Sequence, residues 1–346
     1  MESNYFINLD SCFLIAEIGV NHNGDMHLAK EMIDAAKVSG ADAVKFQTFK
    51  AEALVSQGTP KVKYQENRTS SDESHFDMIK SLELTRDDHF LLNQYCEQRS
   101  IQFLSTPYDV ESARFLCEEL KVEIFKTASA DLIDLPLHQY IASSRKPSIV
   151  SVGMATLGEI EEILSIYKSY QHSDVILLHC VSNYPCANES LNLRVLKTLK
   201  QAFDLPVGYS DHSVGSEAAV LSIAFGAKII EKHFTLDKSL PGPDHVASST
   251  PDEFKLLSDS VRNAEKMLGS SVKSCQPEER QMAEVSRKSI FLKNDMNKDD
   301  IVYEDDLITM RPGSGISPLN IKKIKGMRIN QSLSQGTKLN WSHLAE

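Results

Sequence analysis

Two histidines near the ends of one stretch, SDHSVGSEAAVLSIAFGAKIIEKHF, have side chains suited to metal chemistry: His212 and His233. Neutral imidazoles bind divalent ions, and a site without cysteine that leaves coordination positions open favours a catalytic ion over a closed zinc site. We therefore expect His212 and His233 to hold Mn²⁺, or else Mg²⁺ or Co²⁺, which would polarise a carbonyl group. Their separation of 21 positions matches no short metal motif. A fold must therefore bring the two rings together.

Other polar residues stand at the ends of apolar runs along the chain. Lys45 and Lys126, together with several hydroxyl groups, supply the cations and donors of a phosphate or carboxylate site. One such residue alone is usually a capped turn or a satisfied buried group, but a core does not gather many of them, because unpaired burial of each costs several kcal/mol. The strand-end set contains Glu17, Lys45, Gln47, Thr106, Lys126, Ser129, Asp131, Ser151, His179, Ser210, His212, Glu231 and His233.

The elements that must position these residues repeat along the chain as apolar strands and amphipathic helices. Near-continuous apolar runs are typical of parallel strands buried on both faces. Helical patterns cover residues 28–40, 156–168 and 251–268, and the second opens with the capping-box pair Thr156 and Glu159. Eight strands are expected, at residues 13–19, 43–48, 101–107, 123–129, 147–153, 175–180, 205–211 and 227–233.

Eight strand–helix units over residues 13–268 match the size of a (β/α)8 TIM barrel. A doubly wound sheet is the alternative, but the units are even in length and no Gly-rich GxGxxG turn occurs, which favours the barrel. In a barrel the carboxyl ends of all strands meet at one mouth, where the active site is built. His212 and His233 would then lie on neighbouring strands, about 4.8 Å apart.

Composition divides the chain into further segments. Residues 50–80 are a polar insertion between the second and third strands, and we expect this long loop to cover the barrel mouth. We assign residues 1–268 to the barrel domain and 269–285 to a polar linker. Residues 286–346, with short β-like pieces between turns, are assigned to a small β-rich domain.

Charge and cysteine content limit the partners and the compartment. A net charge of −11 argues against nucleic acid or an anionic membrane as a partner. No run of 18 apolar residues predicts a membrane span, and the first residues lack the basic start of a signal peptide. Six dispersed cysteines without a CxxC pair predict free thiols in a reducing cytoplasm.

Eight motifs, taken together, resemble the bacterial sialic acid synthase family, which includes N-acetylneuraminate, legionaminate and pseudaminate synthases and spore-coat polysaccharide relatives. In chain order they read IAEIGVNHNGD, AVKFQTFKA, FLSTPYD, VSVGMATLGEIEE, LLHCVSNYP, VGYSDHSVG, IIEKHFTLDKSLPGPDH and RPGSGIS. The resemblance covers nearly the whole chain, and its C-terminal part resembles the family's antifreeze-like (SAF) domain.

The resemblance implies a condensation of phosphoenolpyruvate with an N-acetylated amino-sugar aldehyde, such as N-acetylmannosamine or a 2,4-diacetamido-6-deoxy hexose. The products would be phosphate and a nine-carbon 2-keto sugar acid of the sialic or legionaminic acid type. In the family the metal polarises the C1 aldehyde of the sugar, and C3 of the enolpyruvate attacks it.

Site residues carry over position by position as implications of this resemblance. His212 and His233 match metal ligands, Glu17 matches an acid that handles a proton, and Asp131 stands at a second acidic position. Arg311 matches an arginine that reaches the partner subunit's sugar site, which implies a domain-swapped homodimer. The phosphoenolpyruvate positions are Lys45, Thr106, Lys126, Ser129, Ser151 and Ser210, and the sugar positions are Gln47, Tyr184, Asp244 and Arg311.

Two short segments depart from the family pattern. Ser129-Ala130-Asp131 stands where many relatives have Ser-Gly-Glu, so the acid is one methylene shorter. Ser151-Val152-Gly153-Met154 stands where the family has Ser-Thr-Gly-Met, so a hydroxyl is lost. The PGPD run at 241–244 resembles neuraminate and legionaminate synthases more than pseudaminate synthases, and the choice of sugar stays open.

Two other classes of function remain possible from the sequence. One is a barrel aldolase or lyase that forms a Schiff base, for which Lys126 is the candidate nucleophile. The other is a non-catalytic protein that binds a saccharide or regulates glycan assembly. The retention of both histidines, both lysines and the acids argues against the non-catalytic class.

Overall fold

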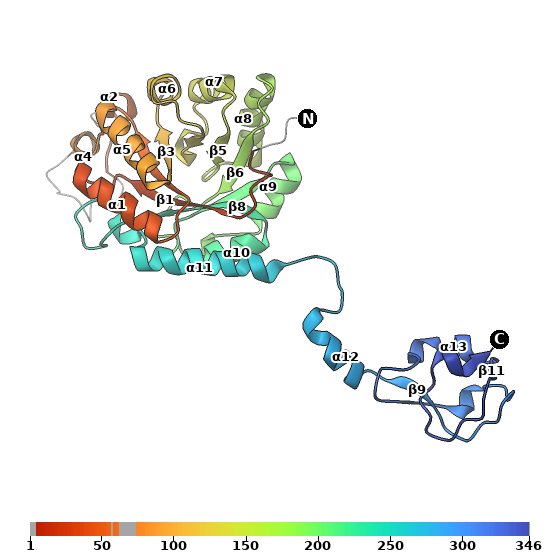
Figure 1. The fold of residues 1–346 in the computed structure, drawn as a ribbon. Helices are drawn as coiled ribbons and strands as arrows, with labels where there is room; N and C mark the ends of the chain where they lie inside the picture. The colour runs from red at the N-terminus through yellow and green to blue at the C-terminus, as the bar shows by residue number, and fades with distance from the viewer. Residues whose placement is uncertain (1–4, 57, 62–73, 346) are drawn as a thin grey trace. The chain divides into compact units, whose positions relative to one another are not determined.

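The computed structural model describes residues 5–56, 58–61 and 74–345, and the chain divides into two compact units, Met1–Gly269 and Ser270–Glu346. Figure 1 colours the first unit from red to cyan and the second in blue. The predicted cover of the barrel mouth falls in large part on residues 57 and 62–73, which lie outside the described residues. At the ends of that insertion the chain forms two short helices, α2 (Ala51–Leu54) and α4 (His75–Ser81).

The first unit contains one sheet of eight parallel strands in the order β3-β2-β1-β8-β7-β6-β5-β4. Because β1 pairs with both β2 and β8, and β3 contacts β4, the order follows the chain around a nearly closed ring. This is a (β/α)8 barrel, and it excludes the doubly wound sheet. The strands are β1 (Phe13–Gly19), β2 (Ala43–Thr48), β3 (Gln102–Pro107), β4 (Phe125–Thr127), β5 (Ser148–Ser151), β6 (Val175–His179), β7 (Val207–Asp211) and β8 (Ala227–His233).

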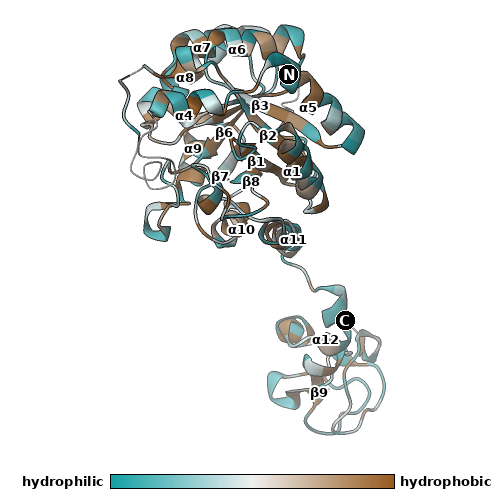
Figure 2. Ribbon diagram, turned by 90° about the vertical axis from the view of Figure 1, so that its left-hand side faces the viewer, coloured by the Kyte–Doolittle hydropathy of each residue, from teal (hydrophilic) through white to brown (hydrophobic). Residues whose placement is uncertain are grey.

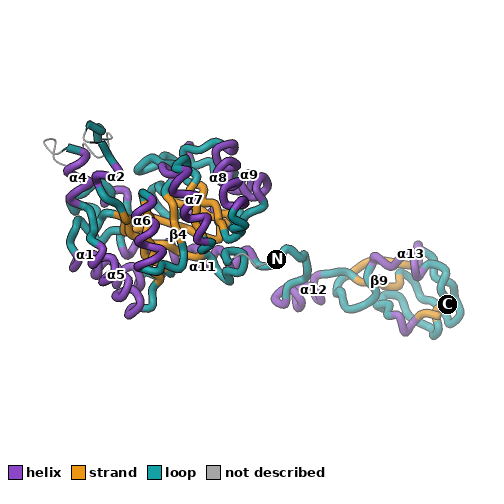
Figure 3. Tube along the Cα trace, turned by 90° about the horizontal axis from the view of Figure 1, so that it is seen from above, coloured by secondary structure: helices purple, strands orange, loops and turns teal. Residues whose placement is uncertain are grey.

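Helices surround the strands of the first unit, as the tube in Figure 3 shows. Figure 2 shows that these helices carry both hydrophilic and hydrophobic residues. The predicted capping box is present, since Thr156 and Glu159 exchange side-chain and backbone hydrogen bonds at the start of α8. Besides α2 and α4, the helices of this unit are α1 (Met26–Val38), α5 (Arg86–Arg99), α6 (Val110–Arg114), α7 (Leu135–Ser144), α8 (Leu157–Ser169), α9 (Val195–Phe203), α10 (Glu217–Ala224) and α11 (Pro251–Leu268).

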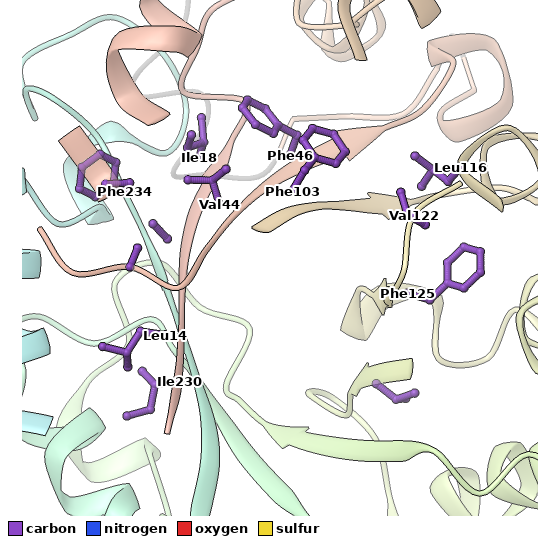
Figure 4. Packing of buried hydrophobic residues seen from close by; sticks show 14 of the residues in the cluster. Leu14, Ile18, Val44, Phe46, Phe103, Leu116, Val122, Phe125, Ile230 and Phe234 are labelled. Carbon is purple, nitrogen blue, oxygen red and sulfur yellow. The ribbon is translucent and has the colours of Figure 1, made fainter. Parts of the chain in front are cut away.

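Along most of the barrel strands, side chains alternate between two hydrophobic clusters. Leu14 belongs to the large cluster between strands and helices, where Phe46 and Phe103 stack with ring centroids 5.6 Å apart (Figure 4). Ile15 belongs to a smaller cluster of residues from the barrel strands and the N-terminal segment. Glu17 is two residues beyond Ile15 and therefore faces the same way, toward the barrel interior at its carboxyl end. This alternation decides which strand-end residues reach the mouth.

The second unit is small and built from short strands and turns around its own apolar core. Strand β9 (Ser289–Leu292) pairs antiparallel with β10 (Leu307–Met310), and β11 (Arg328–Ile329) pairs antiparallel with β12 (Leu344–Ala345). A short helix of four residues, α13 (Ile321–Ile324), lies between β10 and β11. Helix α12 (Arg280–Ser286) covers the last six residues of the predicted linker, 269–285, and the first residue after it, so that segment has regular structure near its end.

The cysteines and the helices of the described chain bear on the predicted free thiols and the predicted lack of a membrane span. The six cysteines are free, with four of them buried and none in a disulfide, as predicted. Within the described part of the chain, no helix has the length and apolar character needed to cross a membrane.

Candidate active site at the barrel mouth

A cavity of ≈ 680 Å³ lies at the carboxyl ends of the barrel strands. Active sites of this fold occupy that position. The cavity brings together eleven of the fourteen site residues expected from the sequence, from seven of the eight strand ends and the loops that follow them. These are Glu17, Lys45, Gln47, Lys126, Ser129, Ser151, Tyr184, Ser210, His212, His233 and Asp244.

Three expected residues do not line this cavity. Thr106 stands behind Lys45, whose Nζ donates to the Thr106 hydroxyl at 2.8 Å. Asp131 directly follows the lining residues Ser129 and Ala130 in the turn after β4 but does not itself line the cavity, and its buried Oδ2 has no hydrogen-bond partner among the described residues. Arg311 belongs to the second unit, where its Nε donates to the carbonyl of Ser286 at 2.9 Å.

The floor of the cavity is a buried group of two lysines and two glutamates. Lys45 Nζ lies 2.6 Å from Glu17 Oε2 and 3.9 Å from Glu231 Oε2. Lys126 Nζ donates to the hydroxyl of Ser151 at 2.7 Å and lies 3.4 Å from Glu231 Oε1. Charges buried this deeply are stable only when paired and hydrogen-bonded. Each ammonium group is therefore fixed in position at the strand ends.

Glu231 is the residue whose role the sequence did not reveal. Its carboxylate lies within 4 Å of both lysines and accepts a hydrogen bond from Ser210 at 2.9 Å. The sequence contains one indication that Glu231 belongs to the site. Glu231 stands two residues before His233 on β8, so both side chains lie on the same face of the strand. Glu231 thus connects Lys45 and Lys126 on the floor of the cavity to β8, the strand that also carries His233.

Burial acts on the two glutamates with opposite outcomes. Burial raises the pKa of Glu17 to about 7, although Lys45 opposes the rise. For Glu231 burial also favours the neutral form, but the combined attraction of Lys126 and Lys45 outweighs it and lowers the pKa to about 2. Two nearby carboxyl groups with separated pKa values can take different roles. At neutral pH Glu231 is an anion, while Glu17 can hold or release a proton.

His212 and His233 do meet at the mouth, with ring centroids 5.6 Å apart. The Nδ1 of His212 lies 2.8 Å from the carbonyl of Val181, and a carbonyl only accepts, so this nitrogen carries the proton. Nε2 is then unprotonated and lies 3.4 Å from the Ser210 hydroxyl. The Tyr184 ring packs against the His212 ring in a tilted arrangement, with ring centroids 4.2 Å apart. The 21 positions between His212 and His233 contain helix α10 and strand β8, which return the chain to the same mouth.

The two imidazoles are suited to a divalent ion. Burial lowers the pKa of both rings, that of His233 to about 3, so both are neutral. His233 Nδ1 is buried without a hydrogen-bond partner in the described structure and lies 3.9 Å from Asp244 Oδ2. Neutral rings with an unpartnered nitrogen fit metal ligation. Among the described residues, at this mouth as elsewhere, no group of three or more His, Cys, Asp or Glu is arranged to hold a metal ion, so the proposed ligand set is the histidine pair alone.

The loop that carries His212 is held from behind by a buried ion pair. Lys232 Nζ lies 2.7 Å from Asp211 Oδ2 and donates to the carbonyl of Ser213 at 2.8 Å. The other oxygen of Asp211 accepts from the backbone N–H and the hydroxyl of Ser213 at 2.9 and 2.7 Å. Both charges are at most 4% exposed. Asp211 and Lys232 therefore fix the backbone on both sides of His212.

We expect Lys232→Met to destabilise the barrel by about 3–5 kcal/mol, because Asp211 would keep a buried charge without its partner. The double variant Asp211→Asn/Lys232→Met should recover part of this loss, since an asparagine oxygen can still accept from Ser213. Denaturant unfolding measures both. A single variant as stable as the starting protein would contradict the assignment.

The departure from the family pattern at Val152 lies in the barrel core, next to a glycine that borders the cavity. Val152 is buried in the large core cluster, so a hydroxyl at this position would face that core. Gly153, in contrast, is required by close approach, because a Cβ there would lie 2.7–2.9 Å from atoms of Ser182, Cys180 and Ser129. The Val152 change therefore leaves the cavity lining intact.

The shorter acid Asp131 provides a stability prediction. Burial, and then Asp134, raise the pKa of Asp131 from its ordinary 3.8 to about 7. The carboxyl is thus easier to protonate in the folded state, and the free energy of unfolding should fall as pH rises from 4 to 7. Asp131→Asn removes this ionisation, so we expect it to stabilise the barrel by about 1–3 kcal/mol at pH 8 and by less at pH 5. Unfolding at both pH values measures this, and equal effects at the two would contradict it.

A (β/α)8 barrel whose mouth combines buried lysines, serine hydroxyls and two neutral histidines defines the class of this protein: a barrel enzyme with a site for an anionic substrate. The chain is, more narrowly, a member of the NeuB family, whose model matches residues 32–273. The family resemblance read from the motifs is confirmed.

Individual relatives match the chain over most of its length. It is 45% identical to an N,N'-diacetyllegionaminic acid synthase of Legionella pneumophila, over 96% of this chain and 95% of that protein. A protein of the same name from Campylobacter jejuni is 43% identical over 90% and 94%. Among solved structures, an N-acetylneuraminic acid synthetase of Leptospira borgpetersenii is 37% identical with a TM-score of 0.72, covering 80% of this chain and 91% of that one.

Proposed function

We propose that this protein condenses phosphoenolpyruvate with an N-acetylated amino-sugar aldehyde, giving a nine-carbon 2-keto sugar acid of the sialic or legionaminic acid type and phosphate. The observation that carries the proposal is one cavity that joins two buried lysines to two neutral histidines. The named synthases among the relatives support the same reaction.

The floor of the cavity provides the site for phosphoenolpyruvate. Lys45 and Lys126, with the hydroxyls of Ser129, Ser151 and Ser210, offer fixed donors for phosphate and carboxylate oxygens. Because the ammonium groups are already held by Glu17, Glu231 and Thr106, they do not need to reorganise when the anion arrives. Preorganised donors of this kind stabilise charge that moves onto the departing phosphate.

The histidine side of the cavity receives the sugar aldehyde. A divalent ion on His212 and His233, with Mn²⁺ as our first choice, would supply Lewis acidity toward the C1 carbonyl. Tyr184 and Gln47 line the same cavity, and Asp244 adjoins His233, so these residues can orient the sugar. Glu17, with its raised pKa, is placed to donate or accept a proton near the bond that forms.

The second unit has a separate part in the proposal. We infer that it is an antifreeze-like (SAF) domain and that its Arg311 approaches the sugar site of a partner subunit in a domain-swapped homodimer. The support is the RPGSGIS motif and the coverage of nearly whole relatives by this chain. A cytoplasmic location, where phosphoenolpyruvate is made, belongs to the same proposal.

Phosphate release tests the reaction directly. Purified protein is incubated with phosphoenolpyruvate, Mn²⁺ and a panel of N-acetylated aminohexoses, and products are identified by mass spectrometry. We expect phosphate only when all three components are present, and loss of release with EDTA. No phosphate with any sugar of the panel would overturn the proposal.

A Schiff-base aldolase is the second candidate, because burial lowers the pKa of Lys126. The surroundings of this lysine oppose that role, since Nζ has Ser151 Oγ, the Thr127 carbonyl and Glu231 within 3.4 Å, an arrangement suited to an ammonium ion. Borohydride treatment with pyruvate should leave Lys126 unmodified. A trapped adduct on Lys126, formed equally with EDTA present, would favour the aldolase instead.

A further inference from the structure

The loops that follow β1 and β8 leave the barrel side by side at its mouth, because Glu17 and His233 are register partners on these neighbouring strands. The loop after β8 contains Asp244, which lines the cavity. The loop after β1 contains Asn21 and Asn23, and neither asparagine lines the cavity. Both asparagines instead contact the loop of Asp244.

The backbone around Asp244 decides where its carboxylate stands in the cavity. Within the described part of the chain, no hydrogen bond holds this carboxylate, and its Oδ2 lies 3.9 Å from Nδ1 of His233, beyond hydrogen-bond distance. The position of the carboxylate therefore depends on how firmly the loop is fixed.

Asn23 fixes the loop through a buried histidine. Its Nδ2 donates to the carbonyl of Pro241 at 2.8 Å and to Nε2 of His245 at 3.3 Å. Burial lowers the pKa of His245 to about 4, so the ring is neutral. Because an amide nitrogen only donates, Nε2 accepts and Nδ1 carries the proton. Nδ1 lies 2.7 Å from the hydroxyl of Thr235, which donates in turn to the carbonyl of Asp237 at 3.1 Å.

Asn21 fixes the same loop at two further points. It is fully buried, and its Nδ2 donates to the carbonyl of Phe234 at 2.9 Å and to the hydroxyl of Ser248 at 2.8 Å. The Ser248 hydroxyl then donates to the backbone carbonyl of Asp244 at 2.7 Å. The loop after β1 thus holds residues 234–248 on both sides of Asp244.

Gly242 allows Asn23 and His245 to meet. Its φ of +142° lies in the region that favours glycine. A Cβ at this position would lie 2.8 Å from Cδ2 of His245 and 2.9 Å from Oδ1 of Asn23. Any larger residue would therefore push the two side chains apart.

We propose that the two asparagines and His245 are positioning residues for the sugar end of the site, because they hold the carboxylate of Asp244 where the amino sugar binds. This inference rests on the proposed condensation, in which Asp244 orients the sugar. The floor lysines are held by other partners, so binding of phosphoenolpyruvate does not depend on these residues.

Asn23→Gly is the main test, because glycine tolerates the φ of +51° at this position and only the side-chain hydrogen bonds are lost. The sugar is N-acetylmannosamine or a 2,4-diacetamido-6-deoxy hexose, whichever is turned over faster. We expect the KM for this sugar to rise ~10-fold, with kcat and the KM for phosphoenolpyruvate within ~2-fold of the starting protein. His245→Leu should act in the same way. His245→Gln still offers an oxygen to Asn23 and should restore most of the affinity.

Asn192→Gly is the matched control. Asn192 also has a left-handed backbone, with φ +46°, but its side chain donates to the carbonyl of Ser190 and it does not line the cavity. Every kinetic constant should stay unchanged in this variant.

A double variant asks whether Asn23 acts through Asp244. Asp244→Asn alone should raise the KM for the sugar, and adding Asn23→Gly to it should change that KM by less than ~2-fold, since both changes affect one carboxylate. Effects that multiply in the double variant, or an unaltered KM for the sugar in Asn23→Gly and His245→Leu, would overturn the inference while the condensation stands. A starting protein that turns over no sugar of the panel would overturn the proposed function, and this inference with it.

Discussion

His212→Ala should lower the rate of phosphate release by about 10³-fold or more and weaken Mn²⁺ binding. The His212 ring is neutral, its Nδ1 proton is committed to the Val181 carbonyl, and its Nε2 is available at the cavity. Removing it takes away one of two proposed metal ligands, and with it several kcal/mol of carbonyl polarisation. Release of phosphate in steady state measures the first effect, and titration of Mn²⁺ by electron paramagnetic resonance measures the second.

His179→Gln is the matched control for this loss. His179 is also a buried histidine at a strand end, but its Nε2 bonds the carbonyl of Leu191 and it does not line the cavity. We expect this variant to lose some stability and to keep its affinity for Mn²⁺. If His212→Ala bound Mn²⁺ as tightly as the starting protein, His212 would be removed from the proposed metal site.

Lys126→Met should raise the KM for phosphoenolpyruvate by about 10²-fold or more. Lys126 is 2% exposed and is fixed by Ser151 and Glu231, so it provides a preorganised charge for an anion. Loss of a buried charge-assisted hydrogen bond costs about 3 kcal/mol or more, and Glu231 would lose one of its two cations. Phosphate release over a range of phosphoenolpyruvate concentrations gives the KM, and calorimetry gives the binding constant.

Lys228→Met provides the comparison on the same barrel. Lys228 is the second residue of β8, near the opposite end of the strand from His233, and its Nζ donates to the carbonyl of Leu9. The KM for phosphoenolpyruvate should be unchanged in this variant. A Lys126 variant with normal phosphoenolpyruvate affinity but lost turnover would move Lys126 from substrate binding to chemistry, and would strengthen the aldolase alternative.

Much of the barrel followed from local patterns. All eight strands lie within the predicted ranges, with β1, β2 and β8 over the same residues and β4 and β5 shorter. Buried parallel strands give continuous apolar runs, and an even strand–helix repeat leaves few ways to close the sheet. Because strand order and strand ends were readable, the meeting of Lys45, Lys126, His212 and His233 at one mouth was predictable too.

The sequence by itself thus determined the barrel, the family and most of the residues at the mouth, since strand periodicity and motif order are local properties of the chain. Only the tertiary structure decided what each side chain touches. It placed Glu231 between two lysines, turned Val152 into the core, kept Asp131 out of the cavity lining and brought Asn23 to His245, 222 positions away in the chain. These outcomes depend on distances across the barrel, which no pattern along one strand or helix contains.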